Sequence, residues 1–264
     1  AIKDAMEGVV EPHVNGIGGD LYAIVWDAKS KKLYGLNGSG RSPKSLTLAE
    51  FKKRGLTHIP STGPLPVSVP GCVDAWFELH KKFGTMPMSK VLEKAVSYAR
   101  NGFPVHGELA SGLARVPANY GKFPNVAEHY YPTGKVPAEG DVFKNPNLAN
   151  TLERLGKEGR DVFYKGDMAR TMDAFMKKNG GFLSYEDLAS HTSTWIDPVS
   201  VNYRGYDVWE LPPNGQGIAA LQMLNILEGY DFSKIKLGSA EHIHLFTEAK
   251  KLVFNVLNAS KAPA

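Results

Sequence analysis

LYAIVWD, residues 21–27, is the stretch of this 264-residue chain that most narrows the class of fold. Its β-branched and aromatic side chains favour a buried strand over a helix, although the alternation does not show which face is inward. The polar residues 27–31 then form a turn, and residues 32–37 provide a second strand. The two strands are predicted to pair as an antiparallel hairpin.

The middle of the chain carries the start and stop signals of helices. Thr47 is a cap residue, Pro70-Gly71 precedes an apolar run, and Gly84 and Gly102 end two runs. A segment rich in Pro, Gly and Tyr is predicted to be a surface loop without long elements. The predicted helices cover residues 48–54, 73–83, 87–101, 148–155 and 168–176, and the predicted loop covers residues 117–146.

A second hairpin and two helices are predicted near the end. Residues 199–203 and 206–211 flank Arg204-Gly205, a pair that suits a two-residue turn. Helices follow over 218–228 and 240–256. Strands near both ends with helices between them lack the regular alternation of a doubly wound sheet, so we predict an α+β fold. A chain of this length can bury one large core, and we predict a single domain over residues 1–264.

Charge and hydropathy exclude several classes of partner. The net charge of +4 comes from 31 basic and 27 acidic residues that are scattered along the chain, so no nucleic-acid-binding stripe is expected. No apolar run reaches the roughly 20 residues of a membrane span. The first residues lack the pattern of a signal peptide. The single cysteine, Cys72, excludes an internal disulfide and favours a buried structural role.

Common motifs of catalysis and cofactor binding are missing. The chain has no GxSxG, P-loop, HExxH or GxGxxG sequence. The glycines of Gly16-Ile17-Gly18-Gly19 precede a strand, and we favour tight backbone packing over substrate contact for them. His242 and His244 point to different faces of a helix, which makes them a poor metal-binding pair. We therefore expect no metal and no organic cofactor.

Three phrases stand in order along the chain. They are VVEPHVNGIGG at residues 9–19, LPVSVPG at residues 65–71 before a helix that contains Trp76, and LPPNGQG at residues 211–217 followed by LNILEG and EHIH. Together they resemble three blocks of the large subunit of the gamma-glutamyltransferase (gamma-glutamyltranspeptidase) family. Three matches in order make chance an unsatisfactory explanation.

The resemblance implies the αββα sandwich of the N-terminal-nucleophile hydrolases, of which this chain is the large-subunit part. It also implies a zymogen that cleaves itself, and a small subunit whose new N-terminal threonine attacks an amide without a cofactor. The chain stops near Ala264, before any matching threonine, so no catalytic residue is expected here and the chain alone should be inactive. The compartment stays open: periplasmic or secreted for an authentic gamma-glutamyltransferase, with a cytoplasmic location also compatible.

The family's substrate-binding arginine is displaced in this sequence. In gamma-glutamyltransferases that arginine lies four residues before a proline and binds the glutamyl α-carboxylate. Counting back from Pro43, the position is Ser39, and a basic residue follows at Arg41. The resemblance therefore makes Ser39 and Arg41 the candidate substrate-binding residues. For Arg41 two interpretations stay open: a solvated loop cation, or a ligand of a substrate carboxylate.

The favoured function is γ-glutamyl transfer or hydrolysis on glutathione-type small-molecule amides. An alternative within the enzyme class is a cephalosporin- or glutaryl-type acylase on the same scaffold. An alternative from another class is a catalytically inactive relative that serves as a structural or binding scaffold. A companion chain that begins with threonine would distinguish the enzymes from the scaffold.

Overall fold

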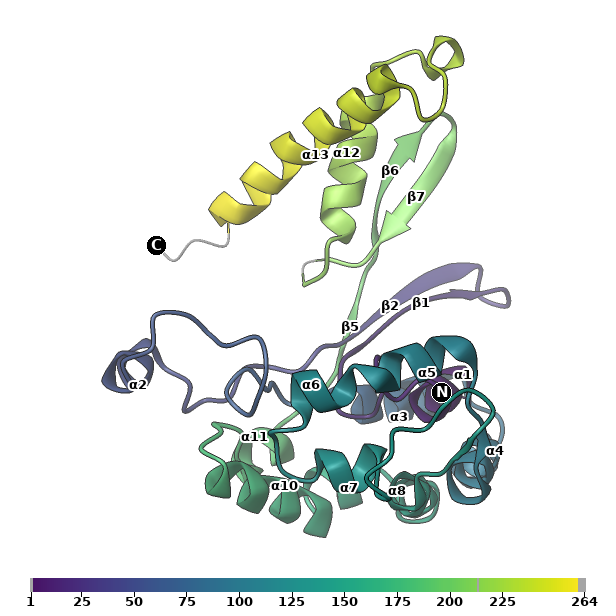
Figure 1. Cartoon of the computed structure of the whole chain (residues 1–264). Coiled ribbons are helices and arrows are strands. Elements are labelled where there is room, and N and C mark those ends of the chain that lie inside the picture. The colour runs from purple at the N-terminus through teal and green to yellow at the C-terminus, as the bar shows by residue number, and fades with distance from the viewer. Residues whose placement is uncertain (1, 213, 261–264) are drawn as a thin grey trace. The chain divides into compact units, whose positions relative to one another are not determined.

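The chain forms two compact units in a computed structural model that describes residues 2–212 and 214–260 (Figure 1). Unit 1 comprises residues 1–21 and 38–193, and unit 2 comprises residues 22–37 and 194–264. Buried apolar side chains lie in both units, such as Trp76 in unit 1 and Leu221 in unit 2. The assignment of residues 1–264 to one domain stays a prediction.

Unit 2 contains both predicted hairpins. β1 and β2 are neighbours in a sheet of order β1-β2-β5, and β2 pairs antiparallel with β5. β6 and β7 are joined by Arg204 and Gly205, whose φ angles of 54° and 85° are the left-handed values that a two-residue hairpin turn requires. The strands are β1 (Leu21–Asp27), β2 (Lys32–Gly38), β5 (Thr194–Ile196), β6 (Val199–Tyr203) and β7 (Tyr206–Glu210).

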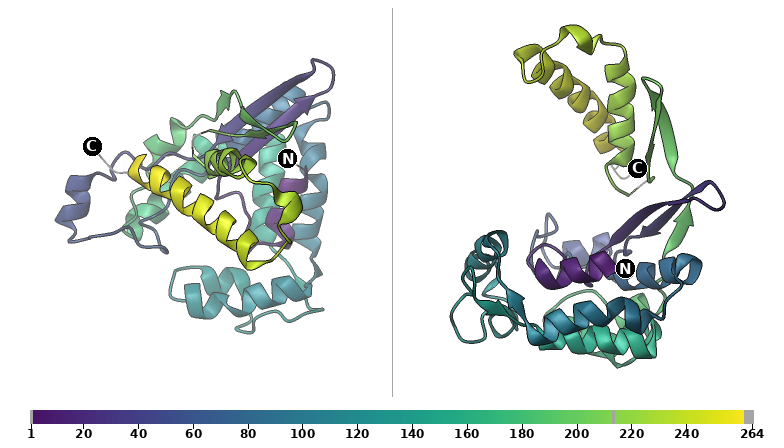
Figure 2. Two further views of the ribbon diagram at one scale, coloured as in Figure 1. Left: turned by 90° about the horizontal axis from the view of Figure 1, so that it is seen from above. Right: turned by 90° about the vertical axis from the view of Figure 1, so that its right-hand side faces the viewer.

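Helices complete unit 2: α12 (Gly217–Glu228), the 3-10 turn η1 (Phe232–Lys234) and α13 (Ala240–Ser260). α12 packs against both strands of the β6–β7 hairpin and against α13 (Figure 2). Leu221 and Leu227 of α12 and Val253 of α13 are buried. Both helices were predicted, and α13 continues four residues past its predicted end at 256.

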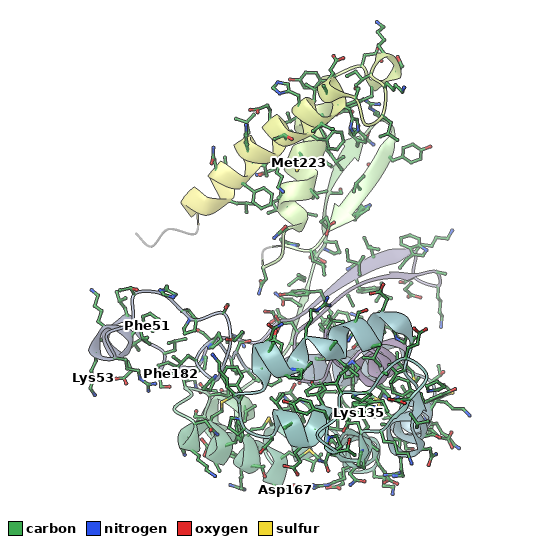
Figure 3. All side chains as sticks on the ribbon, in the orientation of Figure 1. Phe51, Lys53, Lys135, Asp167, Phe182 and Met223 are labelled. Atoms are coloured by element: carbon green, nitrogen blue, oxygen red, sulfur yellow. The ribbon has the colours of Figure 1, made fainter. Side chains whose placement is uncertain are left out.

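Unit 1 is mainly helical, and its most extensively packed pair of helices is α4 with α8. Leu92 of α4 and Leu152 and Leu155 of α8 are buried, and Arg154 of α8 binds Asp167, which Figure 3 labels, with two hydrogen bonds of 2.8 Å. The elements are α1 (Ile2–Val10), α2 (Leu48–Lys53), α3 (Cys72–Phe83), α4 (Met88–Asn101), β3 (Phe103–Pro104), α5 (Gly107–Ala114), α6 (Val116–Tyr120), α7 (Val126–Tyr130), β4 (Val142–Phe143), α8 (Pro146–Glu158), α9 (Asp161–Tyr164), α10 (Asp167–Lys178) and α11 (Tyr185–Ala189).

Short elements are what the sequence failed to predict. The segment 117–146 has no long element, as expected, but α6 lies largely within it, and α7 and β4 lie wholly within it. Tyr130 of α7 donates a hydrogen bond to the Pro12 carbonyl oxygen at 3.2 Å. Helices of one or two turns are unstable alone and show no periodicity, so tertiary contacts such as this one decide whether they form.

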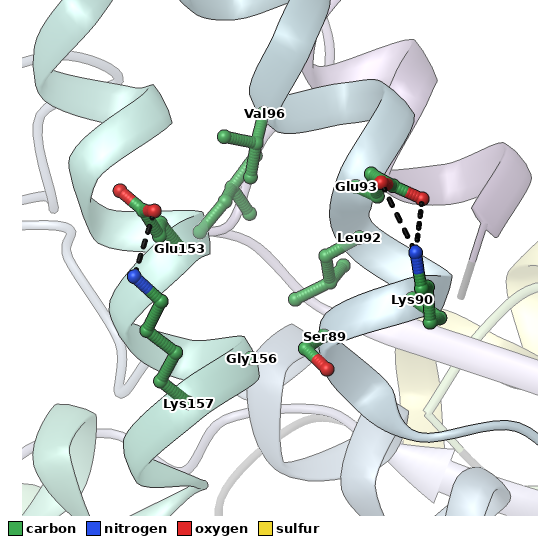
Figure 4. A pocket seen from close by; sticks show the side chains of 9 residues that line it. Ser89, Lys90, Leu92, Glu93, Val96, Glu153, Gly156 and Lys157 are labelled. Atoms are coloured by element: carbon green, nitrogen blue, oxygen red, sulfur yellow. Dashed lines mark hydrogen bonds and ion pairs between the residues drawn. The ribbon is translucent and has the colours of Figure 1, made fainter.

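α4 and α8 approach closely at Ser89 and Gly156 (Figure 4). A Cβ atom on Gly156 would lie 2.9 Å from the Ser89 Cα atom, which is backbone and cannot rotate away. A cavity of about 280 Å³ beside this contact is bordered by the ion pairs Lys90–Glu93 and Glu153–Lys157. These charges are already paired, and Glu153 also binds Arg100 of α4 at 2.9 Å, so we assign the cavity no chemistry.

Gly156→Ala should lower the free energy of unfolding by about 1–3 kcal/mol, because the added methyl group overpacks the contact between α4 and α8. Urea denaturation followed by circular dichroism measures the change. Gly229→Ala is the matched control, since its Cβ atom would meet only the Ile226 carbonyl oxygen, at 3.5 Å. Equal effects of the two substitutions would contradict the close helix contact.

Candidate functional site

Three loops of unit 1 meet at the N-terminus of α3, and we call this place the glycine junction. The Gly19 carbonyl oxygen accepts hydrogen bonds from the amides of Gly71 and Cys72, at 3.0 and 2.9 Å. The Val69 amide donates to the Arg41 carbonyl oxygen at 3.0 Å. The junction consists of residues 16–20, 38–41 and 69–71. Segments from three parts of the sequence are thus joined through backbone atoms.

Glycine is required where these backbones cross. A Cβ atom on Gly40 would overlap the Val69 carbonyl group, and one on Gly71 would overlap the Gly38 carbonyl group. Gly16 and Gly18 differ, because a Cβ atom there would meet nothing within 4 Å. The prediction of tight packing was therefore wrong for Gly18. The Gly16 backbone does pack closely against α1, because a Cβ atom on Gly8 would lie 3.3 Å from the Gly16 Cα atom.

Ser39 and Arg41, the predicted substrate-binding residues, both lie in the glycine junction. Ser39 Oγ donates to Asp20 Oδ2 at 3.4 Å, and the Gly40 amide donates to Asp20 Oδ1 at 2.8 Å. The Arg41 side chain is exposed, and no carboxylate in the described part of the chain forms an ion pair with it. The structure places both residues at one accessible surface, while their role with substrate stays a prediction.

Asp20 was not identified from the sequence. Its one signal is its position directly after the glycine run, which fits a turn as well as a binding residue. Its hydrogen-bond partner Gly40 lies 20 residues away, so only the folded chain reveals the contact.

A cluster of charges around the buried Asp74 lies at the first turn of α3, three residues beyond the junction. Asp74, which is 3% exposed, accepts hydrogen bonds from Arg160 Nε and from the Ser193 amide, the latter at 2.5 Å. Arg160 also donates to the His191 carbonyl oxygen at 2.5 Å. Burial alone would raise the pKa of Asp74, but the hydrogen bonds from Ser193 and Arg160 outweigh burial and hold its pKa below the usual value.

Tyr164 links this cluster to the junction. Its hydroxyl group accepts from the Asp74 amide at 2.9 Å and donates to the Pro70 carbonyl oxygen at 2.6 Å. Pro70 belongs to the junction, so the buried charges and the three loops form one hydrogen-bonded structure. Movement of α3 would therefore move the loop that carries Arg41.

His191 packs beside the cluster in its neutral form. Its ring stacks on Tyr164 with centroids 5.4 Å apart, and neither ring nitrogen has a hydrogen-bond partner among the described residues. Burial lowers the pKa of His191, and the Asp74 carboxylate, 4.0 Å from its Nε2 atom, offsets only part of that effect.

The described residues contain no group of three or more His, Cys, Asp or Glu side chains that could hold a metal ion. The His242 ring packs against Phe246 and Phe232, at centroid distances of 4.7 and 6.3 Å. Cys72 is buried at the start of α3, and burial raises the pKa of its thiol, as expected of a structural cysteine. Among the described helices, none has the length and apolar character to cross a bilayer.

A family model described as Gamma-glutamyltranspeptidase matches residues 3–259. The chain belongs to the gamma-glutamyltranspeptidase family. The glutathione hydrolase-like YwrD proenzyme of Bacillus subtilis (strain 168) is 38% identical over 247 residues, which are 93% of this chain and 47% of that protein. Acylase ACY 1 proenzyme of Pseudomonas sp. (strain SE83) is 34% identical over 193 residues, 73% of this chain and 35% of that protein.

Solved structures of this family share the fold. Helicobacter pylori gamma-glutamyltranspeptidase has a TM-score of 0.90 at 29% identity, over 96% of this chain and 74% of that one. Cephalosporin acylase from Bacillus halodurans has a TM-score of 0.89 at 39% identity, over 96% of this chain and 48% of that one. The predicted family and the α+β N-terminal-nucleophile hydrolase fold are confirmed. The chain spans about half the length of the first curated relative it matches.

His191→Phe should reduce the pH dependence of stability. The unfolded chain binds a proton at His191 below about pH 6.5, whereas the folded chain resists it, so the free energy of unfolding falls as the pH drops. Urea denaturation between about pH 7.5 and 5.5 measures the free energy of unfolding against pH. The slope of that dependence should be steeper in the wild type than in His191→Phe, by up to about 1.4 kcal/mol per pH unit.

The variant keeps an aromatic ring against Tyr164, and His129, whose pKa burial also lowers, retains its own share of the slope. His58→Gln, at an exposed position, is the control that should keep the wild-type slope. An unchanged slope in His191→Phe would mean that His191 is not held neutral.

Proposed function

We propose that residues 1–264 are the large-subunit part of a processed amidohydrolase whose small subunit supplies an N-terminal threonine. The reaction is hydrolysis or transfer of a γ-glutamyl-type acyl group from a small-molecule amide such as glutathione. The observation that carries the proposal is the family match across residues 3–259, together with relatives that are glutathione hydrolase proenzymes. Those relatives include the enzyme of Escherichia coli (strain K12), 37% identical over 199 residues.

The proposed chemistry proceeds in two steps on the companion chain. The threonine hydroxyl oxygen bonds to the amide carbonyl carbon, its proton passes to the free α-amine, and the leaving amine departs with that proton. Water or an acceptor amine then attacks the resulting ester, which releases the acyl group and restores the hydroxyl. Hydrogen-bond donors that face the carbonyl oxygen stabilise both tetrahedral intermediates.

The role of this chain is to bind the acyl group. Arg41 carries a permanent positive charge on an exposed side chain, while its backbone is fixed through Val69. A guanidinium group binds a carboxylate through two parallel hydrogen bonds, so it selects the orientation of the acyl group as well as its charge. We assign Arg41 to the substrate carboxylate and Ser39, beside it, to a second polar contact.

One face of β1 fits the proposed companion chain. Tyr22, Ile24 and Trp26 are 43%, 40% and 60% exposed and alternate along the strand, so they point the same way. β1 is also an end strand of its sheet within the described residues. An exposed row of aromatic and branched side chains on an end strand is typical of an interface with another chain.

Intact-mass and N-terminal analysis of the purified product of the complete gene tests the processing. We expect two chains, of which the smaller begins with threonine, because an N-terminal nucleophile exists only after cleavage. A single unprocessed chain, or a small chain with another first residue, would support the inactive scaffold instead.

Arg41→Ala should raise KM for L-γ-glutamyl-p-nitroanilide by about 10- to 100-fold, since a hydrogen bond to a charged group contributes about 1.5–3 kcal/mol. Arg115→Ala, at another exposed arginine of unit 1, is the control and should leave KM unchanged. Wild-type turnover with an unaltered KM in Arg41→Ala would refute the binding role.

An acylase is the second candidate, and two observations favour it. Ser39 stands where the arginine of the transferases is expected, and the cephalosporin acylase from Bacillus halodurans is more similar in sequence than the H. pylori transpeptidase, at 39% against 29% identity. A glutaryl amide lacks only the α-ammonium group of a γ-glutamyl amide. The ratio of kcat/KM for the two anilides therefore separates the candidates.

A further inference from the structure

We propose that Asp20 is a positioning residue for the Ser39–Arg41 segment and, through it, sets the affinity for the acyl carboxylate. This inference rests on the binding role proposed for Arg41. Asp20 does not itself touch the substrate. It fixes the backbone from which the Arg41 side chain extends.

Both carboxylate oxygens of Asp20 accept hydrogen bonds from the Ser39–Arg41 segment. Oδ1 accepts the Gly40 amide proton at 2.8 Å, and Oδ2 accepts from Ser39 Oγ at 3.4 Å. Hydrogen bonds to an ionised carboxylate are stronger than those between neutral groups. One side chain therefore binds a backbone amide and a side chain directly before Arg41.

Val69 restrains the Ser39–Arg41 segment independently of Asp20. The Val69 amide donates to the Arg41 carbonyl oxygen at 3.0 Å, and Gly40 lies so close to the Val69 carbonyl group that no Cβ atom fits. Glycine restrains its own backbone least of all residues, so the position of Gly40 depends on these outside contacts. Removal of the Asp20 carboxylate would leave the Gly40 amide without this partner.

Asp20 is itself well anchored. The preceding residue, Gly19, accepts two amide hydrogen bonds from Gly71 and Cys72 at the start of α3. The restraint thus runs from α3 through Gly19 and Asp20 to the loop that carries Arg41. Tyr164 ties the same end of α3 to the buried charge cluster.

The hydrogen-bond partners of Asp20 also leave the Arg41 guanidinium group available for a ligand. The carboxylate of Asp20 bonds to Gly40 and Ser39, and it forms no ion pair with Arg41 in the described part of the chain. An Asp20–Arg41 ion pair would compete with a substrate carboxylate for the guanidinium group. The observed arrangement uses the acidic residue to orient the loop and leaves the basic residue for the ligand.

The test uses the complete processed enzyme and L-γ-glutamyl-p-nitroanilide, with glutaryl-p-nitroanilide as second substrate. Asp20→Ala should raise KM about tenfold and leave kcat within about threefold, because a binding group is displaced while the nucleophile is untouched. Asp20→Asn keeps an oxygen acceptor for the Gly40 amide and should recover most of the affinity. In the Arg41→Ala background, Asp20→Ala should add less than about twofold, since it acts through Arg41.

Asp27→Ala is the matched control. Asp27 accepts backbone amides of Lys29 and Ser30 and the Ser30 hydroxyl in the β1–β2 turn, which is the same acceptor chemistry away from the junction. It should leave KM unchanged. A purely structural role of Asp20 would instead show as lower stability with full additivity to Arg41→Ala, and that outcome overturns the proposal.

Hydrogen exchange of the segment 38–41, measured by mass spectrometry, does not depend on turnover. Asp20→Ala should exchange these amides faster than the wild type and Asp27→Ala should not, because Asp20 protects the Gly40 amide. Unchanged exchange overturns the positioning role even if the substrate is misassigned. A processed wild-type enzyme that turns over neither anilide contradicts the proposed function, while faster exchange in Asp20→Ala would still support the restraint.

Discussion

The buried ion pair between Asp74 and Arg160 is the interaction on which unit 1 depends most. Asp74 is buried and Arg160 is partly exposed. A buried carboxylate without a partner costs several kcal/mol, so Asp74 depends on Arg160 at this place. The pair joins the first turn of α3 to the residue before α9, 86 positions later in the sequence, and the Ser193 amide completes the coordination of the carboxylate. The Asp74 carboxylate thereby connects the start of α3 to Arg160, which precedes α9, and to Ser193, the last residue of unit 1.

The glycine junction is connected to this ion pair through the start of α3. α3 begins at Cys72, whose amide and that of Gly71 are bound to the Gly19 carbonyl oxygen in place of water. The helix start is therefore both the anchor of the charge cluster and the platform for the loop that carries Arg41. The exposed segment around Arg41 is in this way tied to charged groups that lie beneath the surface.

Local signals explain what the sequence predicted well. Arg204-Gly205 marks its hairpin because two residues with positive φ angles are needed there, and Thr47 accepts the Glu50 amide as a helix cap should. The ordered phrases around Gly16 and Leu65 led to the family and, through Pro43, to Ser39 and Arg41. The hairpin turn, the helix cap and each single phrase depend on residues a few positions apart, and only the order of the phrases spans the chain.

Long-range pairing explains what the sequence did not predict. The hydrogen bond between Asp20 and Gly40 joins residues that are 20 positions apart. The ion pair of Asp74 with Arg160 spans 86 positions, and no local sequence pattern predicts either contact. α1, α6 and α7 were missed because short helices form only when the rest of the fold is present. Gly18 was misinterpreted because a glycine run looks alike whether it borders packed atoms or open space.

The crowding around Gly38, Gly40 and Gly71 restricts how the proposed acyl-binding site can diversify. A side chain at any of these positions would collide with neighbouring backbone atoms, so the path of the segment cannot be redrawn by point substitution. Variation that preserves the fold is confined to the side chains of Ser39 and Arg41, on either side of Gly40. Natural divergence and laboratory libraries alike would have to explore new acyl groups by exchanging side chains on a constant backbone.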